Sequence, residues 1–245
     1  MDKQIRFFEE LSFNSHVALK TQFYDGWIMR CANGYTNRAN SIGMLYQSTI
    51  DLQTKISHCE AFYFGLNQPC VFKVTDDNDI DGILEQKGYK IVTPTYVMTM
   101  DLVDKEFETV DAVVTSIVTD EWLQAYYELE HYTNSQTQNT IKLMLDRLQN
   151  EALYCRIVDN GKTIACASAV IERGYMALLN VIVDEQYRGY GYGKKLCEAL
   201  LSKSKEAGAH TAYLQVVQEN KVALSLYEKL GYRKIYSYWY RVKAV

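Results

Sequence analysis

Three alternate glycines separate a short apolar run from a helix-like run, and this spacing could bind a phosphate. Gly189, Gly191 and Gly193 follow the apolar residues 181–183 and precede Lys194. Because glycine has no Cβ, the backbone here can turn tightly and approach a ligand closely. A helix beginning at Lys194 would point its first free N–H groups, and the positive end of its dipole, into this loop. The stretch therefore predicts an anion site, most often one for phosphate.

Two common phosphate loops do not fit this spacing. A P-loop places four residues between its first glycine and a Gly-Lys-Ser/Thr sequence, but Gly189 lies only four positions before Gly193, and Lys195 follows Lys194. A dinucleotide-binding loop needs Gly-x-Gly-x-x-Gly and an acidic residue on the next strand. Here the third glycine comes one residue early, and the next strand ends in Gln-Val-Val at residues 215–217. Both classes of nucleotide loop are excluded.

The pattern that remains is Arg188-x-x-Gly191-x-Gly193. It resembles the pyrophosphate-binding signature of the GNAT superfamily of N-acetyltransferases. The resemblance implies that the loop holds the pyrophosphate of acetyl-CoA as co-substrate. Taken alone, the motif leaves open a plain glycine-rich helix start.

A second motif supports the resemblance. The spacing Asn220-x-x-Ala223-x-x-x-Tyr227-x-x-x-Gly231-Tyr232 is similar to the C-terminal signature of the same superfamily. It follows the glycine loop at the distance seen in that superfamily. Two motifs in this order across one strand are much more specific than either alone. The resemblance covers residues 108–243 well.

The expected elements of this part of the chain have the order β-α-α-β-β-β-α-β-α-β, which is the order of the GNAT fold. We therefore expect an α/β (α+β) fold with a mixed, mostly antiparallel twisted sheet flanked by helices. Asp159-Asn160-Gly161-Lys162 predicts a hairpin turn, and Asp120 and Asn220 are expected helix caps. The expected strands and helices are strand 108–118, helices from 120 and about 141, strands 152–158, 163–171 and 175–183, helix 194–207, strand 211–217, a helix after 220 and a last strand.

The first hundred residues predict a similar series of elements. They are helix 2–18, strand 26–31, helix 48–62, strand 70–74, helix 78–89 and strand 95–100. The sequence from Leu84 to Lys90, Leu-Glu-Gln-Lys-Gly-Tyr-Lys, aligns with Tyr-Glu-Lys-Leu-Gly-Tyr-Arg from Tyr227 to Arg233. This repeat predicts an internal duplication, although chance similarity of two helix-glycine-strand units stays open.

The duplication suggests a tandem member of the superfamily with two unequal domains. Residues 1–103 would form a degenerate GNAT-like domain, and residues 104–245 the catalytic domain, with the junction at the charged stretch 101–106. The corner around Arg38 lacks alternating glycines, and Leu84 stands where Tyr227 stands in the second copy. We therefore expect one cofactor site per chain.

Composition narrows the possible partners. The 245-residue chain has a net charge of -4, which gives no electrostatic reason to bind nucleic acid. No apolar run approaches the roughly 18 residues of a membrane span and no signal peptide is seen, so we expect a cytoplasmic protein without a membrane partner. The six cysteines and four histidines are dispersed, which predicts buried thiols and no metal site. The oligomeric state stays open.

The resemblance also implies particular site residues. Tyr227 would protonate the leaving thiolate, although a core tyrosine is the alternative, and Asn220 could be a helix cap, a cofactor contact or both. Strand 175–183 has no carboxylate, so no general base is assigned; Glu172, Glu130 and Asp184 are candidates. The implied cofactor contacts are Val181, Ile182, Val183, Arg188, Gly189, Tyr190, Gly191, Tyr192, Gly193, Lys194 and Asn220.

The expected function is transfer of the acetyl group of acetyl-CoA to a primary amine of a small molecule or peptide by direct attack. The alternative is a non-catalytic acyl-CoA-binding module whose N-terminal half binds a partner protein. A nucleotide-binding regulator is a third hypothesis, which requires ATP to bind better than CoA.

Overall fold

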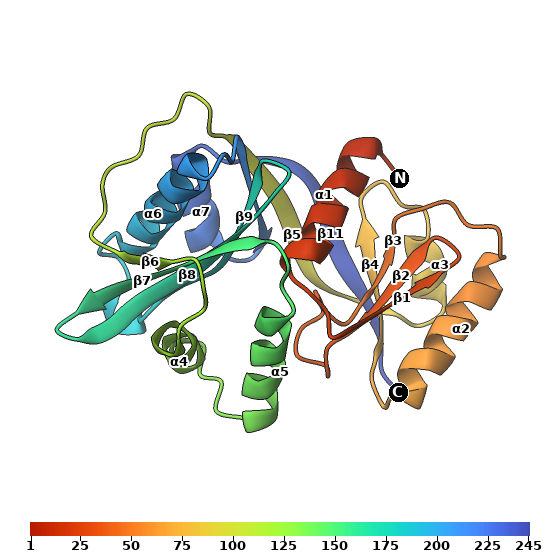
Figure 1. Cartoon of the computed structure of the whole chain (residues 1–245). Coiled ribbons are helices and arrows are strands. Elements are labelled where there is room, and N and C mark those ends of the chain that lie inside the picture. Colours follow the sequence, from red (N-terminus) through yellow and green to blue (C-terminus); the bar gives the residue numbers. More distant parts are fainter. The chain divides into compact units, whose positions relative to one another are not determined.

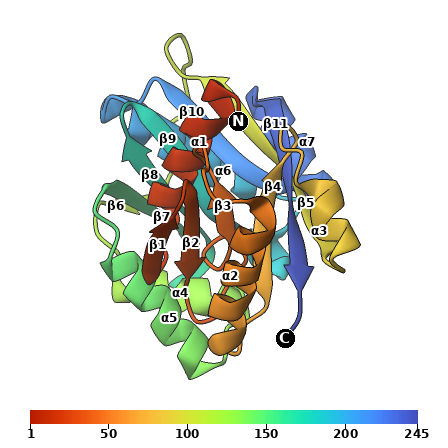
Figure 2. The same ribbon diagram turned by 90° about the vertical axis from the view of Figure 1, so that its right-hand side faces the viewer.

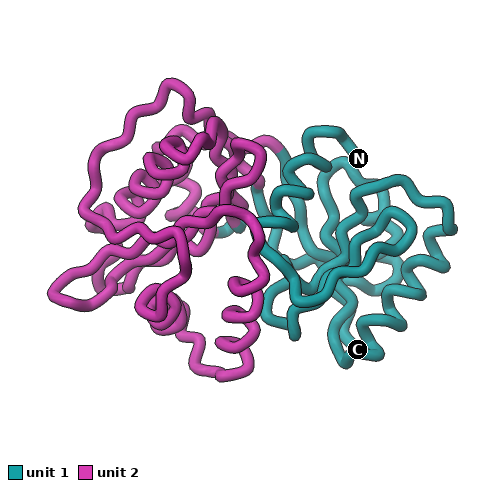
Figure 3. Tube along the Cα trace, viewed as in Figure 1, with its two compact units in different colours: residues 1–96, 217–219, 236–245 teal, residues 97–216, 220–235 magenta.

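The computed structural model describes residues 1–245, and the chain divides into two compact units (Figure 3). Unit 1 consists of Met1–Tyr96, Val217–Glu219 and Tyr236–Val245. Unit 2 consists of Val97–Val216 and Asn220–Ile235. The C-terminal residues thus belong to the unit that is formed mainly by the first hundred residues.

The boundaries of these units differ from the division at 103/104 expected from the sequence. Strand β5 (Lys90–Asp101) begins in unit 1 and ends in unit 2, and strand β11 (Arg233–Lys243) begins in unit 2 and ends in unit 1. A charged stretch after a strand is a sensible place for a linker. Here, however, each long strand continues from one unit into the other. Each unit therefore contains a strand segment from the other half of the sequence.

Unit 2 has the order of elements that its sequence predicts. In Figure 1 helices α4 and α5 lie on one face of its sheet, and α6 and α7 on the other. Its strands are adjacent in the order β10-β9-β8-β7-β6; β9 and β10 are parallel, and the other pairs are antiparallel. The elements are β6 (Val113–Thr115), α4 (Asp120–Leu129), α5 (Ser135–Asp146), β7 (Glu151–Asp159), β8 (Lys162–Glu172), β9 (Tyr175–Val183), the 3₁₀ turn η1 (Glu185–Tyr187), α6 (Tyr192–Glu206), β10 (Thr211–Val217) and α7 (Lys221–Leu230).

Three local predictions in unit 2 are wrong. Helix α5 begins at Ser135, capped by Asn134, and not at about residue 141. The expected strand 108–118 is reduced to β6, because only Val113–Thr115 pairs with β7. Valine and threonine favour a strand only where a neighbouring strand and a buried face are present. The cap of α4 is Thr119, whose hydroxyl accepts a hydrogen bond from the Trp122 amide at 3.2 Å, while Asp120 is the first helical residue.

The predicted hairpin between β7 and β8 is confirmed. Asn160 and Gly161 have φ angles of 47° and 80°, which are the left-handed conformations that a two-residue turn of this kind requires. Asp159 pairs with Lys162 across the turn. The turn sets the register of β7 against β8.

Unit 1 contains a five-strand arrangement with the order β1-β2-β3-β4-β11 (Figure 2). Strands β3 and β4 are parallel, and β4 and β11 are antiparallel. A core that includes Trp27, Ile56, Tyr63 and Phe72 lies between the strands and α2 and α3. The elements are α1 (Lys3–Ser15), β1 (Lys20–Tyr24), β2 (Trp27–Cys31), β3 (Ile42–Met44), α2 (Leu52–Gly65), β4 (Cys70–Thr75) and α3 (Asp81–Gln86), followed by the first part of β5.

All three helices of unit 1 have different bounds from the predicted ones, and α1 ends at Ser15 instead of residue 18. Helix α2 starts after Asp51, not at residue 48, because the Asp51 carboxylate accepts from the Thr54 amide at 2.9 Å and caps the helix there. Helix α3 is shorter than the predicted 78–89. The Asn78 side chain accepts from the Ile80 amide at 3.1 Å, which makes a local turn before the helix begins.

The internal repeat is visible in how α3 and α7 end. Gly88 and Gly231 have φ angles of 86° and 105°, which favour glycine at the end of a helix. The Tyr89 amide donates to the Leu84 carbonyl at 3.0 Å, and the Tyr232 amide donates to the Tyr227 carbonyl at 2.9 Å. Both helices thus end with the same hydrogen bond at aligned positions.

The repeat also identifies the counterpart of the glycine loop. In unit 2 the loop joins β9 to α6, and in unit 1 residues 45–51 join β3 to α2. The corner around Arg38, which the sequence suggested as the counterpart, precedes β3 instead. Residues 45–51 contain no glycine. The counterpart of the glycine loop in unit 1 is therefore loop 45–51 and not the corner around Arg38. The conclusion that this counterpart lacks the alternating glycines is unchanged.

A buried charged cluster connects three elements of unit 1. Lys73 of β4 lies 2.7 Å from Glu9 of α1, and the hydroxyl of Tyr236 on β11 donates to the same carboxylate at 2.7 Å. His16, just after α1, has a buried Nε2 without a hydrogen-bond partner. Burial, followed by the charges of Arg38, Arg30 and Lys73, lowers the pKa of His16 to about 3.

Replacing His16 by glutamine should make folding less sensitive to acid. The folded protein keeps His16 neutral, whereas the unfolded chain takes up a proton below pH about 6.5. Stability is therefore lost as the pH falls from about 6.5 toward 3, by about 2 kcal/mol at pH 5. Urea unfolding at neutral pH and at pH 5 should show a smaller loss for His16→Gln than for wild type. His210→Gln, at an exposed histidine, is the control; equal losses in wild type and His16→Gln would contradict the prediction.

Candidate active site

Strand β9 pairs with its parallel neighbour β10 only over its first half. The paired residues run from Tyr175 opposite Thr211 to Leu178 opposite Leu214. On its other side, β9 stays paired with β8 as far as Val183. From Leu179 onward one edge of β9 has no strand partner, and residues 179–183 are half-buried. This edge includes Val181, Ile182 and Val183, and its free backbone groups could pair with an extended ligand.

Asn180 lies where strands β9 and β10 separate, and the sequence analysis did not identify it. It has a φ angle of 54°, and the pairing of β8 with β9 shifts register between Cys166 and Ser168. These two features define a β-bulge, in which one strand has an extra residue. Asparagine is among the residues that tolerate this backbone conformation. An asparagine inside an apolar strand sequence was the signal that could have indicated the bulge.

The glycine loop lies directly after this free edge. Gly189 and Gly191 have φ angles of 85° and 83°, and a Cβ added at either would meet no atom within 4 Å. Both glycines are thus required by backbone conformation, not by crowding. Helix α6 begins at Tyr192, two residues earlier than predicted, with Gly191 as its cap residue. Because glycine has no side chain, no side chain caps the first amides of α6.

Gly193 has a different reason to be glycine. It lies in the first turn of α6, where an added Cβ would come within 3.3 Å of the Leu226 side chain on α7. Its small size therefore lets the two helices pack closely. Lys194 follows and lies 3.2 Å from Glu198. The exposed Tyr190 and the half-buried Tyr192 complete the predicted loop.

Arg188 is held against the loop by its own neighbours. Its Nε donates to the Val183 carbonyl at 3.2 Å, and its Nη1 lies 3.3 Å from Glu185 Oε1. The guanidinium is therefore fixed beside the end of β9, with part of its surface exposed. This arrangement holds a cation at the end of β9, four residues before α6 begins at Tyr192.

The second motif is positioned by α7. The side chain of Asn220 accepts a hydrogen bond from the Ala223 amide at 3.0 Å, so it caps this helix as predicted. Tyr227 lies one to two turns further on, and its side chain is largely buried, with its ring 5.9 Å from that of Tyr232. The structure confirms that Asn220 is a cap. Its contact with a cofactor stays a prediction.

Residues 3–241 match the family described as "Probable histone acetyltransferase Rv0428c C-terminal". This match covers almost the whole chain, and the two motifs and the order of elements agree with it. The chain belongs to this family. It is an acetyltransferase of the GNAT type.

Relatives and a solved structure agree with this assignment. The chain is 27% identical to the uncharacterized N-acetyltransferase YobR of Bacillus subtilis, over 98% of each chain. It is 33% identical to the [ribosomal protein bS18]-alanine N-acetyltransferase of Escherichia coli K12, over 34% of this chain and 55% of that enzyme. A tandem GNAT protein from the clavulanic acid biosynthesis pathway has a TM-score of 0.67 at 13% identity, over 83% of this chain and 74% of that one, which shows a shared fold.

The three candidate bases of this acetyltransferase differ in their surroundings. Glu172 is opposite Tyr175, at the far end of the β8–β9 pair, roughly 23 Å along the strand from the glycine loop at about 3.3 Å per residue. Asp184 pairs with Lys162 at 2.7 Å, and this hydrogen bond lowers its pKa. Partial desolvation raises the pKa of Glu130, whose side chain is exposed, against the opposing charges of His131 and Arg188. A general base must take up the proton of the amine, but Glu130 is exposed and Asp184 is paired with Lys162, so none of the three is assigned.

Two cavities do not provide a phosphate site. A cavity of about 290 Å³ beside Tyr192 and Lys195 is lined by four carboxylates, which repel a polyanion. They belong to Glu108, Asp111, Asp159 and Glu198.

No group of three or more His, Cys, Asp or Glu side chains is arranged to hold a metal ion, and no helix is long and apolar enough to cross a membrane.

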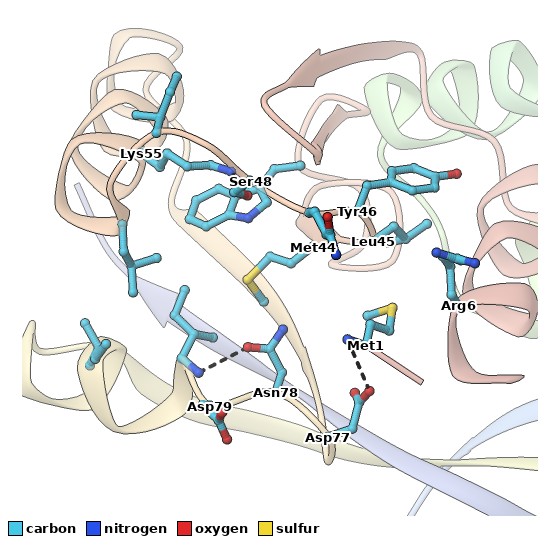
Figure 4. A pocket seen from close by; sticks show the side chains of 16 residues that line it. Met1, Arg6, Met44, Leu45, Tyr46, Ser48, Lys55, Asp77, Asn78 and Asp79 are labelled. Atoms are coloured by element: carbon cyan, nitrogen blue, oxygen red, sulfur yellow. Dashed lines mark hydrogen bonds and ion pairs between the residues drawn. The ribbon is translucent and has the colours of Figure 1, made fainter. Parts of the chain in front are cut away.

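The second cavity, of about 500 Å³, lies in unit 1 beside residues 44–50. In Figure 4, Lys55 and Ser48 lie at one end of it, and Asp77 and Asp79 at the other. The Lys55 ammonium is 3.3 Å from the Asp25 carboxylate and contacts the Ser48 hydroxyl. The same carboxylate accepts from the amides of Thr49 and Ile50 at 2.9 Å. Lys55, one of two cationic side chains that line this cavity, and the loop amides are thus already paired within the protein.

Replacing Gly191 by alanine should weaken the affinity for a CoA ligand. Gly208, at the end of α6, is a matched control, because it also has a positive φ of +91° and open space around its Cβ position. Each alanine should cost about 1–2 kcal/mol of stability, since L-residues disfavour this conformation. Only Gly191→Ala should reduce the affinity measured by calorimetry, on the order of tenfold or more, because only this Cβ lies at the anion site. Equal affinities in the two variants would remove the loop from the site.

Proposed function

We propose that this chain transfers the acetyl group of acetyl-CoA to a primary amine of a small molecule or peptide, using one site in unit 2. The observation that supports this most is the order of three features along the chain from β9 to α6. The unpaired edge of β9 leads directly into the Arg188–glycine loop and the uncapped start of α6. This combination matches an extended amide-bearing arm that ends in a pyrophosphate.

The donor would bind along this succession. Backbone groups of Val181, Ile182 and Val183 would pair with the pantetheine amides as an added strand does. The amides from Gly189 to Lys194, with Arg188, would hold the pyrophosphate. An amide near Val181 would polarise the thioester carbonyl, as in an oxyanion hole. Asn220 would contribute a further contact at the start of α7.

The chemistry is a direct transfer. The amine nitrogen attacks the thioester carbon, the new C–N bond forms, and the C–S bond breaks with its electron pair leaving on sulfur. Tyr227 gives its phenolic proton to the thiolate of CoA. The proton of the amine goes to a base, for which Glu172, Glu130 and Asp184 are the candidates. An ammonium acceptor must lose one proton before attack, since it has no free electron pair, and the nitrogen gives a second proton to the base as the amide forms.

The acceptor class includes peptide amines because of one relative. The Escherichia coli enzyme acts, by its name, on an alanine of ribosomal protein bS18, and its similarity is limited to about a third of this chain. We extend to this chain only the class of acceptor, an amine of a peptide or a small molecule. The protein is proposed to act in the cytoplasm, where acetyl-CoA and such amines occur together.

Unit 1 is proposed to be a degenerate GNAT-like domain without a donor site. Its loop 45–51 has no glycine, and Leu84 replaces the tyrosine found at Tyr227. The Lys55 ammonium and the loop amides are paired with Asp25. A titration with acetyl-CoA should therefore give one site per chain by calorimetry. Two sites per chain in the wild-type protein would contradict this assignment of unit 1.

Replacing Tyr227 by phenylalanine should slow turnover at least about tenfold while acetyl-CoA binds normally, because only the proton donor is removed. Tyr232→Phe is the matched control. Its ring is adjacent to Tyr227, and its buried hydroxyl has no hydrogen-bond partner. Turnover is measured as acceptor-dependent release of CoA in a screen of amines and peptides. Unchanged turnover of Tyr227→Phe with a good acceptor would remove Tyr227 from the mechanism.

The same screen separates the transferase from its rival. Acetylated product detected by mass spectrometry is the expected result. Binding of acetyl-CoA without release of CoA by any acceptor would instead favour the non-catalytic binding module. Tighter binding of ATP than of CoA would contradict both.

A further inference from the structure

Helix α4 packs against the bulge of strands β8 and β9. Ala167 lies opposite the extra residue of the bulge, since the register shifts between Cys166 and Ser168. The Trp122 indole of α4 donates to the Ala167 carbonyl at 3.0 Å and to the Cys155 carbonyl at 3.2 Å. A buried donor satisfies a carbonyl that the bulge would leave unpaired.

Both polar atoms of the Asn180 side-chain amide form hydrogen bonds. Its Oδ1 accepts from the Tyr126 hydroxyl at 3.3 Å, and its Nδ2 donates to the Ser168 hydroxyl at 3.0 Å. Tyr126 is in turn stacked on Trp122, with ring centroids 5.3 Å apart and an angle of 18° between the planes. Tyr126, Trp122 and Ser168 are buried. The side chain that occupies the bulge therefore has a rigid support.

We infer that Asn180 is a positioning residue for acetyl transfer, and that Tyr126 and Ser168 hold it in place. The inference rests on the proposed function of this site. Asn180 immediately precedes Val181, the first residue of the β9 edge that we propose binds the donor. Its left-handed backbone sets the direction of the next peptide group, and the two side-chain hydrogen bonds fix that backbone against rotation. The thioester carbonyl is then polarised by an amide whose direction does not change during the reaction.

The physical reason for such a support is geometric. A polarising hydrogen bond stabilises the charge that develops on the carbonyl oxygen only when the donor is aimed at that oxygen in advance. Val181 has no strand partner on the side of β10, so pairing with β10 cannot fix its peptide. The β8–β9 register also skips Asn180 and Val181 at the bulge, so side-chain contacts are left to fix this peptide. Helix α4 provides them through Tyr126 and Trp122.

The sharpest test compares two adjacent tyrosines of α4. Tyr126→Phe removes the hydroxyl that meets Asn180. Tyr127→Phe removes a hydroxyl from a tyrosine that is also buried, but that donates to the Gln138 carbonyl at 2.8 Å instead. Tyr126→Phe should lower kcat severalfold, with the KM for acetyl-CoA nearly unchanged, because binding and the glycine loop stay intact. Tyr127→Phe should leave both constants as in wild type.

Asn180→Gly tests the side chain without straining the backbone. Glycine adopts the positive φ of this position readily, so the variant keeps the bulge and loses only its support. Its kcat should fall on the order of tenfold or more, and the fall in Tyr126→Phe combined with Asn180→Gly should not exceed that of Asn180→Gly alone. A sum of the two separate effects would contradict a shared role.

A spectroscopic measurement keeps the test independent of the acceptor. The carbonyl resonance of acetyl-CoA labelled with carbon-13 at that carbon should move downfield when it binds to wild type and to Tyr127→Phe. The movement should be smaller with Asn180→Gly and Tyr126→Phe, while calorimetry shows that both still bind the donor. Equal resonances in all four proteins, or unchanged kcat in both Asn180→Gly and Tyr126→Phe, would overturn the inference. Failure of wild type to bind acetyl-CoA would instead remove the proposed function of the site.

Discussion

The partial pairing of β9 is the constraint on which the rest of unit 2 depends. Parallel strands that stay paired along their whole length offer no free backbone to a ligand. Here the pairing with β10 stops after Leu178, while β8 continues to hold β9 as far as Val183. The exposed edge is therefore open on one side and supported on the other. A free edge of this kind binds an extended ligand without first having to unfold.

The start of α6 depends on the same arrangement. The strand ends beside the loop, so the arm and the phosphate end of the proposed donor would meet consecutive parts of the chain. Gly189 and Gly191 permit the loop to turn, and Arg188 is held at its base by the Val183 carbonyl. The uncapped amides of α6 remain available because its cap residue is a glycine. The proposed anion site thus depends on the course of the strand as well as on the local sequence of the loop.

The two units show how one plan of elements can carry different chemistry. In both, a parallel strand pair is followed by a helix that ends in a glycine with positive φ and the same hydrogen bond. In unit 1, however, the loop amides and Lys55 are paired with Asp25. Unit 1 instead contains a buried network in which Glu9, Lys73 and Tyr236 connect α1, β4 and β11. Since a buried charge is costly without its partner, these three elements must form together.

The sequence by itself determined the elements of unit 2, the glycine loop, the cap at Asn220 and the superfamily, because these depend on local spacing. The periodicity of the hydrophobic residues, the turn residues and the distances between motifs can all be read from residues that are close together in the sequence. It missed the reduction of strand 108–118 to β6, since a strand needs a partner that local sequence does not show. Only the tertiary structure decided that β11 ends in unit 1, that loop 45–51 corresponds to the glycine loop, and that Asn180 lies between Tyr126 and Ser168. Tyr126 and Asn180 are 54 positions apart, and no pattern of neighbouring residues brings such groups together; packing of α4 on the sheet does.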